Sequence, residues 1–192
     1  MAMLTRSTFL RRGSALALSG SALAILAGPA AADAPPAGDL AYLRLLIAVE
    51  LLAIDFHTNA LAAGAPAKPV KTMLADENAH YRGLALLMSA AGQNPATAGD
   101  IDFSYPKGTF DTAASIAKEA SSLEALQLGA YLGAVENVQT PQLRRVIGQI
   151  SANESQHVAA VSVWTGGPVI GPAFGPVLEI DAVSAVLGEY ES

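Results

Sequence analysis

Two copies of one short motif limit the folds open to this chain. A Glu stands three residues before a His in both, at Glu77–His80 and at Glu154–His157. Three residues make about one helical turn, so each motif places a carboxylate and an imidazole on the same helix face. Such a pair can bind one metal ion when other helices supply the remaining ligands. The motifs therefore indicate a helical protein that holds metal between its helices.

Apolar residues at helical spacing predict four long helices, over residues 39–63, 68–91, 111–138 and 141–164. Asp39 is expected to cap the first helix, Gly92 to end the second and Pro141 to occupy the first turn of the fourth. The connections after the first and third helices are short, whereas residues 93–109 form a long, turn-rich connection. We therefore predict an all-α four-helix bundle with one long crossover between its second and third helices.

The hairpin geometry predicts which other glutamates lie level with the two motifs. Residues equally far from the turn of an antiparallel pair lie at the same height. His80 and Glu50 are 16 and 14 residues from residue 64, and Glu154 and Glu124 are both 15 residues from residue 139. Glu50 and Glu124 are therefore expected beside the motifs. Two other glutamates belong to the third helix. Glu136 is expected near the end of that helix, and Glu119 is expected to face solvent.

The two halves of the chain also match each other. Glu50 is followed seven residues later by His57, and Glu124 is followed seven residues later by Tyr131. This repeat indicates a duplicated hairpin with pseudo-twofold symmetry and favours one shared site. His57 lies two turns, roughly 10 Å, from Glu50, so we expect it beside the site and not as a ligand. Packing in the core is the alternative role for His57 and for Tyr131.

On these residues the sequence resembles the ferritin-like superfamily, and within it the exported bacterial ferritin-like proteins related to desiccation-associated proteins. The resemblance covers about residues 39–190 and includes a Gly/Pro-rich C-terminal extension with a short helix, residues 166–192. It implies that His80 and His157 each bind one of two ions. Glu50 and Glu124 would then be terminal ligands, and Glu77 and Glu154 would bridge the ions. His57 departs from the family, which more often has a phenol there.

The donor set indicates which cofactor the site would take. Cysteine is absent from the chain, which excludes disulfides, thiolate metal sites and iron–sulfur clusters. Four carboxylates and two imidazoles suit two iron or two manganese ions better than zinc. Two such ions would allow redox or oxidative-stress chemistry on O₂, peroxide or Fe²⁺. Whether the protein is a di-iron or di-manganese oxidoreductase is left open. The alternatives are a non-catalytic stress or desiccation protector, an iron-storage cage, and a polar network without metal.

The N-terminus has the pattern of an export signal. Residues 1–32 carry no acidic residue, and three arginines precede an apolar run that ends at Ala30–Ala32, a small-residue cleavage site. The run is too short to span a bilayer stably. The signal resembles the twin-arginine type, although Ser7 replaces the second arginine, so the export route stays open. We expect cleavage near Ala32, a periplasmic or secreted protein, a linker over 33–38 and the bundle over 39–165.

The charge of the chain after residue 32 limits its partners. All 17 acidic residues and 8 of the 11 basic residues lie there, which gives a formal charge of 8 − 17 = −9. An acidic chain without a basic patch disfavours nucleic acid and anionic lipid as partners. We therefore expect metal ions and small oxidants as partners, with no stable membrane insertion. A homo-oligomer is left open.

Overall fold

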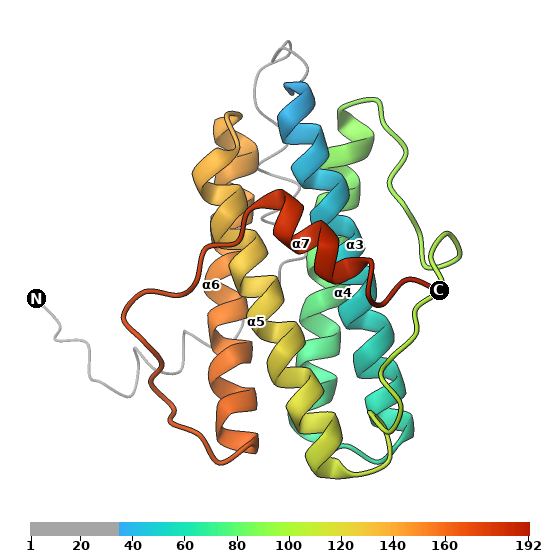
Figure 1. The fold of residues 1–192 in the computed structure, drawn as a ribbon. Helices are drawn as coiled ribbons and strands as arrows, with labels where there is room; N and C mark the ends of the chain where they lie inside the picture. The colour runs from blue at the N-terminus through green and yellow to red at the C-terminus, as the bar shows by residue number, and fades with distance from the viewer. Residues whose placement is uncertain (1–34) are drawn as a thin grey trace, which may run out of the picture. The chain divides into compact units, whose positions relative to one another are not determined.

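The computed structural model describes residues 35–192. Four long helices form a bundle in these residues, and a fifth, short helix crosses it (Figure 1). The predicted export signal lies outside the described residues. The first two long helices and the last two each form an antiparallel hairpin, and residues 91–112 run along the bundle between them. The predicted all-α bundle with one long crossover is confirmed. In chain order the helices are α3 (Ala37–Ala62), α4 (Ala67–Ala90), α5 (Ala113–Asn137), α6 (Pro141–Trp164) and α7 (Ile180–Leu187).

Local sequence signals account for four of the helix ends in the described residues. The backbone N–H of Ser115 donates to the hydroxyl of Thr112, and the N–H of Thr112 donates to the hydroxyl of Ser115, both at 3.0 Å, which starts α5. Pro141 stands in the first turn of α6, as predicted. Gly64 and Gly92 follow α3 and α4 with φ values of 89° and 73°. Glycine adopts this left-handed backbone without steric cost, so these two residues end their helices.

Asp39 does not cap the helix in which it lies, so that prediction is wrong. Pro36 is the residue before α3, and Asp39 sits buried in the first turn. Its carboxylate accepts the backbone N–H groups of Gln139 and Thr140, at 2.9 and 2.8 Å. Both donors belong to the short connection between α5 and α6. Asp39 therefore joins the start of α3 to the start of α6 across a hundred residues of sequence.

Asp39→Ala should lower the free energy of unfolding by about 2 kcal/mol, because it removes the charged acceptor of the partly buried backbone N–H groups of Gln139 and Thr140. Burial raises the pKa of Asp39, but hydrogen bonds from Gln139 and Thr140, with the charge of Arg144, outweigh it and hold the pKa below its usual value. The charge-linked part of the stabilisation is therefore present above about pH 4 and is lost as the pH falls through the lowered pKa. Denaturant unfolding at several pH values should show the gap to the wild type narrowing in acid. The exposed Asp111→Ala variant should change stability by less than about 0.5 kcal/mol.

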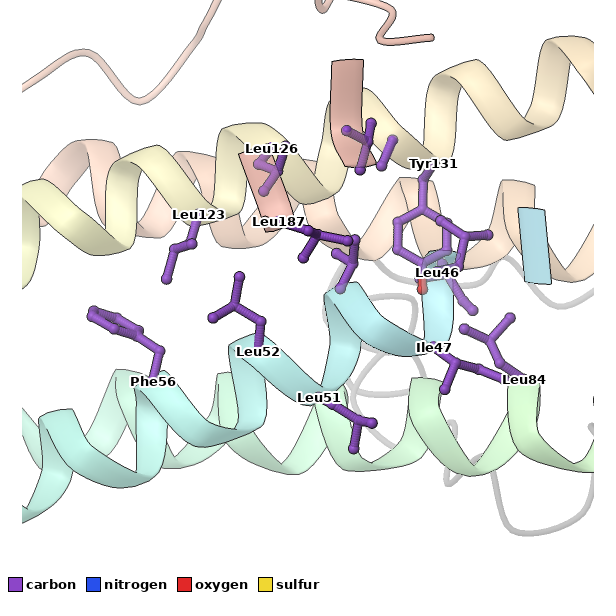
Figure 2. Close-up of a cluster of buried hydrophobic side chains, with 14 of the residues drawn as sticks. Leu46, Ile47, Leu51, Leu52, Phe56, Leu84, Leu123, Leu126, Tyr131 and Leu187 are labelled. Atoms are coloured by element: carbon purple, nitrogen blue, oxygen red, sulfur yellow. The ribbon is translucent and has the colours of Figure 1, made fainter. Parts of the chain in front are cut away.

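The apolar core runs between the helices and is completed by α7 (Figure 2). Leu187 of α7 is buried among leucines of α3 and α5, including Leu52 and Leu126. Helix α7 contacts α3 and α5, and it covers the side of the bundle that these two helices form. Within residues 35–192, no helix has the length and apolar character needed to cross a membrane.

The segment before α7 lies directly on α5 at two glycines. Leu178 donates its backbone N–H to the carbonyl of Gly129 at 3.1 Å. A Cβ atom on Gly129 would stand 2.7 Å from Cδ1 of Leu178, and one on Gly133 would overlap the carbonyl oxygen of Leu178. The absence of side chains at these two positions therefore allows the C-terminal extension to reach the helix surface.

Gly133→Ala should displace this extension. Alanine favours a helix over glycine by up to about 1 kcal/mol. Overlap with the Leu178 backbone should outweigh this gain and lower the free energy of unfolding by about 1–3 kcal/mol. Gly83→Ala is the matched control, because a Cβ there meets nothing within 4 Å on a helix of the same bundle. It should be neutral or stabilising. Urea unfolding of both variants checks the difference, and equal stabilities would contradict the close contact.

Candidate metal centre

All six predicted ligands converge between the four bundle helices. α3 and α5 each contribute one glutamate, and α4 and α6 each contribute a complete Glu-x-x-His motif. Each of the six residues is buried, with at most 4% of its surface exposed. The register argument from the two hairpins therefore placed the two isolated glutamates at the correct height. The six residues are Glu50, Glu77, His80, Glu124, Glu154 and His157.

The six residues form two overlapping groups, each suited to one ion. In each group one donor atom per residue lies within 4.8 Å of all the others. Glu77 and Glu154 belong to both groups, so their carboxylates can bridge two ions. The group that adds Glu50 and His80 is called the His80 position below. The group that adds Glu124 and His157 is called the His157 position.

Both imidazoles turn the same ring nitrogen toward the carboxylates. His80 Nδ1 lies 2.9 Å from Glu154 Oε1 and 3.3 Å from Glu77 Oε2. His157 Nδ1 lies 3.0 Å from Glu77 Oε1 and 3.4 Å from Glu154 Oε2. The ring centroids are 6.2 Å apart. Each imidazole thus faces both shared carboxylates, and the pseudo-twofold symmetry of the sequence is present in the geometry.

The outer nitrogens of the two imidazoles contact residues that the sequence analysis did not single out. His80 Nε2 lies 3.0 Å from Asn153 Oδ1, and His157 Nε2 lies 3.3 Å from Asp76 Oδ2. Each partner stands immediately before the Glu of the opposite motif. Asp76 and Asn153 thus occupy the same position of the two motifs, and this repeat in the sequence could have identified them.

His57 and Tyr131 each contact the isolated glutamate of the opposite hairpin. His57 Nε2 lies 3.0 Å from Glu124 Oε1, and the hydroxyl of Tyr131 donates to Glu50 Oε1. Both rings are buried, at 1% and 0% exposure. They lie beside the candidate ligands, where the sequence analysis expected them. Their crosswise pairing was not foreseen, because the repeat relates each ring only to the glutamate on its own helix.

Gln127 is a further buried residue of the site that sequence reasoning missed. Its amide Nε2 donates to Glu77 Oε2 at 3.1 Å and to Glu154 Oε2 at 3.2 Å. It follows Glu124 by three residues, so the same helical spacing that identified the two motifs could have located it. One amide thus fixes both carboxylates that the two positions share.

Other glutamates of α5 lie away from this centre. Glu136 lies in the last turn of α5, near the helix end as predicted, and is exposed. The expectation that Glu119 faces solvent is wrong, because it is half-buried and accepts a hydrogen bond from the hydroxyl of Tyr190. The residues after α7 cover this part of α5, which the sequence pattern of α5 alone does not reveal. An open surface pocket beside Lys118 and Trp164 is lined by none of the site residues.

Burial and mutual charge shift the protonation of the centre strongly. Burial raises the pKa of Glu50 well above its ordinary value, and the charge of Glu77 adds to this rise. Burial and the charge of Glu77 also raise the pKa of Glu154. For Glu77 burial acts upward too, but hydrogen bonds from the two histidines outweigh it and lower its pKa. Burial lowers the pKa of His80, yet hydrogen bonds to the carboxylates, Glu154 first, raise it to about 12.

The donor atoms fit two divalent cations. Each of the four carboxylates keeps one buried oxygen without a well-directed hydrogen bond: Glu50 Oε2, Glu77 Oε1, Glu124 Oε2 and Glu154 Oε1. These four oxygens share two imidazole nitrogens, because His80 Nδ1 and His157 Nδ1 each face two of them at 2.9–3.7 Å. Buried carboxylates with so few donors are costly, and four close together repel one another. Two divalent cations would supply four positive charges for four negative ones. The shortage disfavours a polar network without metal, because two imidazole N–H groups cannot give each of the four oxygens its own hydrogen bond.

Comparison with protein families agrees with this architecture. The family model described as "Ferritin-like domain" matches residues 38–166, which include all six candidate ligands and the four bundle helices almost entirely. A comparison with curated proteins found no match. The matched region comprises two thirds of the chain and coincides with the helices that surround the buried carboxylates. The chain therefore belongs to the ferritin-like domain family.

Proposed function

We propose that this protein is an exported ferritin-like protein that binds a dinuclear iron or manganese centre and performs redox or oxidative-stress chemistry. One observation carries the proposal: four buried carboxylates surround two imidazoles in two overlapping groups, and each carboxylate has an oxygen without a well-directed hydrogen bond. The membership of those groups supports Glu77 and Glu154 as bridging ligands. It supports Glu50 and Glu124 as terminal ligands, one at each position.

The centre's surroundings support a role in controlling the ions rather than only storing them. Hydrogen bonds from Tyr131 and His57 orient the terminal carboxylates, and Gln127 orients the shared pair. Burial of all six ligands excludes bulk water. Two bound redox-active metals can exchange electrons with O₂, peroxide or Fe²⁺. The oxygen and imidazole donors favour iron or manganese for this purpose.

A non-catalytic protective role is the second candidate. The same burial that excludes water also restricts the approach of a substrate, because every candidate ligand is at most 4% exposed. A protein that only needs a stable fold under stress requires no access to its metal. In this role the ions would act as structural cross-links between four helices.

Turnover assays separate the two candidates. Protein loaded with iron or manganese should consume O₂, peroxide or Fe²⁺ faster than the same amount of free metal. Glu77→Ala should lose that rate together with bound metal, because Glu77 belongs to both ligand groups. Glu136→Ala, at an exposed position on α5, should keep both. A fully loaded wild type with no rate above free metal would favour the protective role.

Export is the part of the proposal supported by the N-terminal sequence pattern alone. Arginines before an apolar run and an Ala-rich end are typical of cleaved signals. Expression of the full chain in a bacterial host, followed by mass measurement of periplasmic protein, should give a mature chain that begins after about Ala32. Retention of the intact chain in the cytoplasm would contradict export.

A further inference from the structure

The two histidines of the centre differ by one charge on their outer side. His157 Nε2 faces the carboxylate of Asp76, whereas His80 Nε2 faces the amide oxygen of Asn153. Both partners come from the position before the Glu of the opposite motif, so their geometry is nearly equivalent. The pseudo-twofold symmetry of the centre is therefore broken by charge at this pair.

The outer partner of a metal-binding histidine determines how strongly the inner nitrogen donates. An acceptor at Nε2 keeps the proton there and leaves the Nδ1 lone pair for the metal. Both Asp76 and Asn153 can do this. Only a carboxylate also adds negative charge, which raises the basicity of the imidazole, and loss of such a partner commonly weakens metal affinity 10- to 100-fold.

We propose that Asp76 and Asn153 make the two ion positions unequal, so that the His157 position binds a divalent cation about tenfold more tightly than the His80 position. The inference depends on the proposed dinuclear centre. It assigns Asp76 as a positioning residue that acts through His157. The two positions would then fill in a fixed order, with the His157 position first.

The other described contacts of the centre differ between the two positions in one ring. Each terminal carboxylate receives one hydrogen bond from a ring, from His57 at one position and from Tyr131 at the other. Gln127 donates to both shared carboxylates at nearly equal distances, 3.1 and 3.2 Å. With a neutral His57, the Asp76 and Asn153 pair is the one difference of charge among these contacts.

Titration of metal-free protein with Mn²⁺ tests the proposal, with free Mn²⁺ measured by its electron paramagnetic resonance signal. The wild type should bind in two steps. Asp76→Asn should weaken the tighter step about tenfold, and Asn153→Asp should tighten the weaker step about tenfold. Both substitutions nearly preserve side-chain shape, and they change charge in opposite directions. The shared carboxylates alone could separate two steps, so the opposite responses of these variants decide the question.

Two further variants assign the steps. His80→Ala should remove the weaker step and keep the tighter one. Asp55→Asn is the charge control, because Asp55 is a half-buried aspartate of α3 that contacts Tyr105 and Asn59 instead of a site histidine. It should shift either step by less than about twofold, because an indirect charge effect is screened by salt.

The outcomes distinguish this inference from the proposed function. Two Mn²⁺ steps that neither Asp76→Asn nor Asn153→Asp changes would overturn the inequality and leave the dinuclear centre standing. Equal shifts in the Asp55→Asn control would overturn the specific role of Asp76. A wild type that binds no Mn²⁺ and no Fe²⁺ would instead overturn the proposed function, and the inference with it.

Discussion

Glu77→Ala should eliminate binding of both metal ions, whereas Glu50→Ala should eliminate only one. Glu77 supplies a carboxylate to both ligand groups, but Glu50 belongs to the His80 position alone. Both residues are fully buried glutamates in the same hairpin, so the comparison is matched for side-chain type and burial. Protein loaded with Mn²⁺, desalted and analysed by elemental mass spectrometry should retain no ion in the first variant and one in the second.

The symmetric comparison strengthens this test. Glu124→Ala should also retain one ion, and combined with Glu50→Ala it should retain none. Glu136→Ala should retain two, since that residue is exposed and outside both groups. If Glu77→Ala and Glu50→Ala lost the same amount of metal while both remained folded, the assignment of shared and terminal carboxylates would be wrong.

Metal loading should raise the unfolding temperature by roughly 15–30 °C, the second large effect. Two ions that bind only the folded state contribute about 8 kcal/mol when each is present at a thousand times its dissociation constant. In the metal-free protein the four buried carboxylates repel one another, and bound cations would remove this repulsion and stabilise the folded state. Thermal unfolding of loaded and chelator-treated protein, monitored by circular dichroism, provides the measurement.

Substitutions in the centre supply the control for this stabilisation. His157→Ala should reduce the shift on loading, because it removes one of the two imidazole ligands. Gly83→Ala lies on a helix of the bundle and should keep the full shift. Identical unfolding temperatures for loaded and chelated wild type would contradict a metal centre at this place.

The helices and the convergence of the six candidate ligands could be predicted from sequence because helix geometry is rigid. Spacings of three residues within a motif and of fifteen residues from a turn determine face and height before any packing is known. The observed bounds of α6, Pro141–Trp164, equal those predicted. The same rigidity placed Glu50 and Glu124 beside the motifs and Glu136 away from them.

Features that depend on contacts distant in sequence could not be predicted in this way. The bonds from Asp39 to the backbone of Gln139 and Thr140 join residues about a hundred positions apart, so a local capping rule gave the wrong partner. The path of Leu178 over α5 and the contact between Tyr190 and Glu119 involve the irregular C-terminal extension, which has no periodicity to interpret. Interactions between helices within the centre were also missed, because helical spacing describes one helix at a time.

The metal content of the mature protein tests the central claim most directly. Protein purified from its native compartment without chelators should carry about two iron or manganese ions per chain, as measured by elemental mass spectrometry against protein concentration. The identity of the metal would then determine which oxidant to assay first. Protein with no bound metal, and with no rise in unfolding temperature on addition of Fe²⁺ or Mn²⁺, would contradict the dinuclear centre.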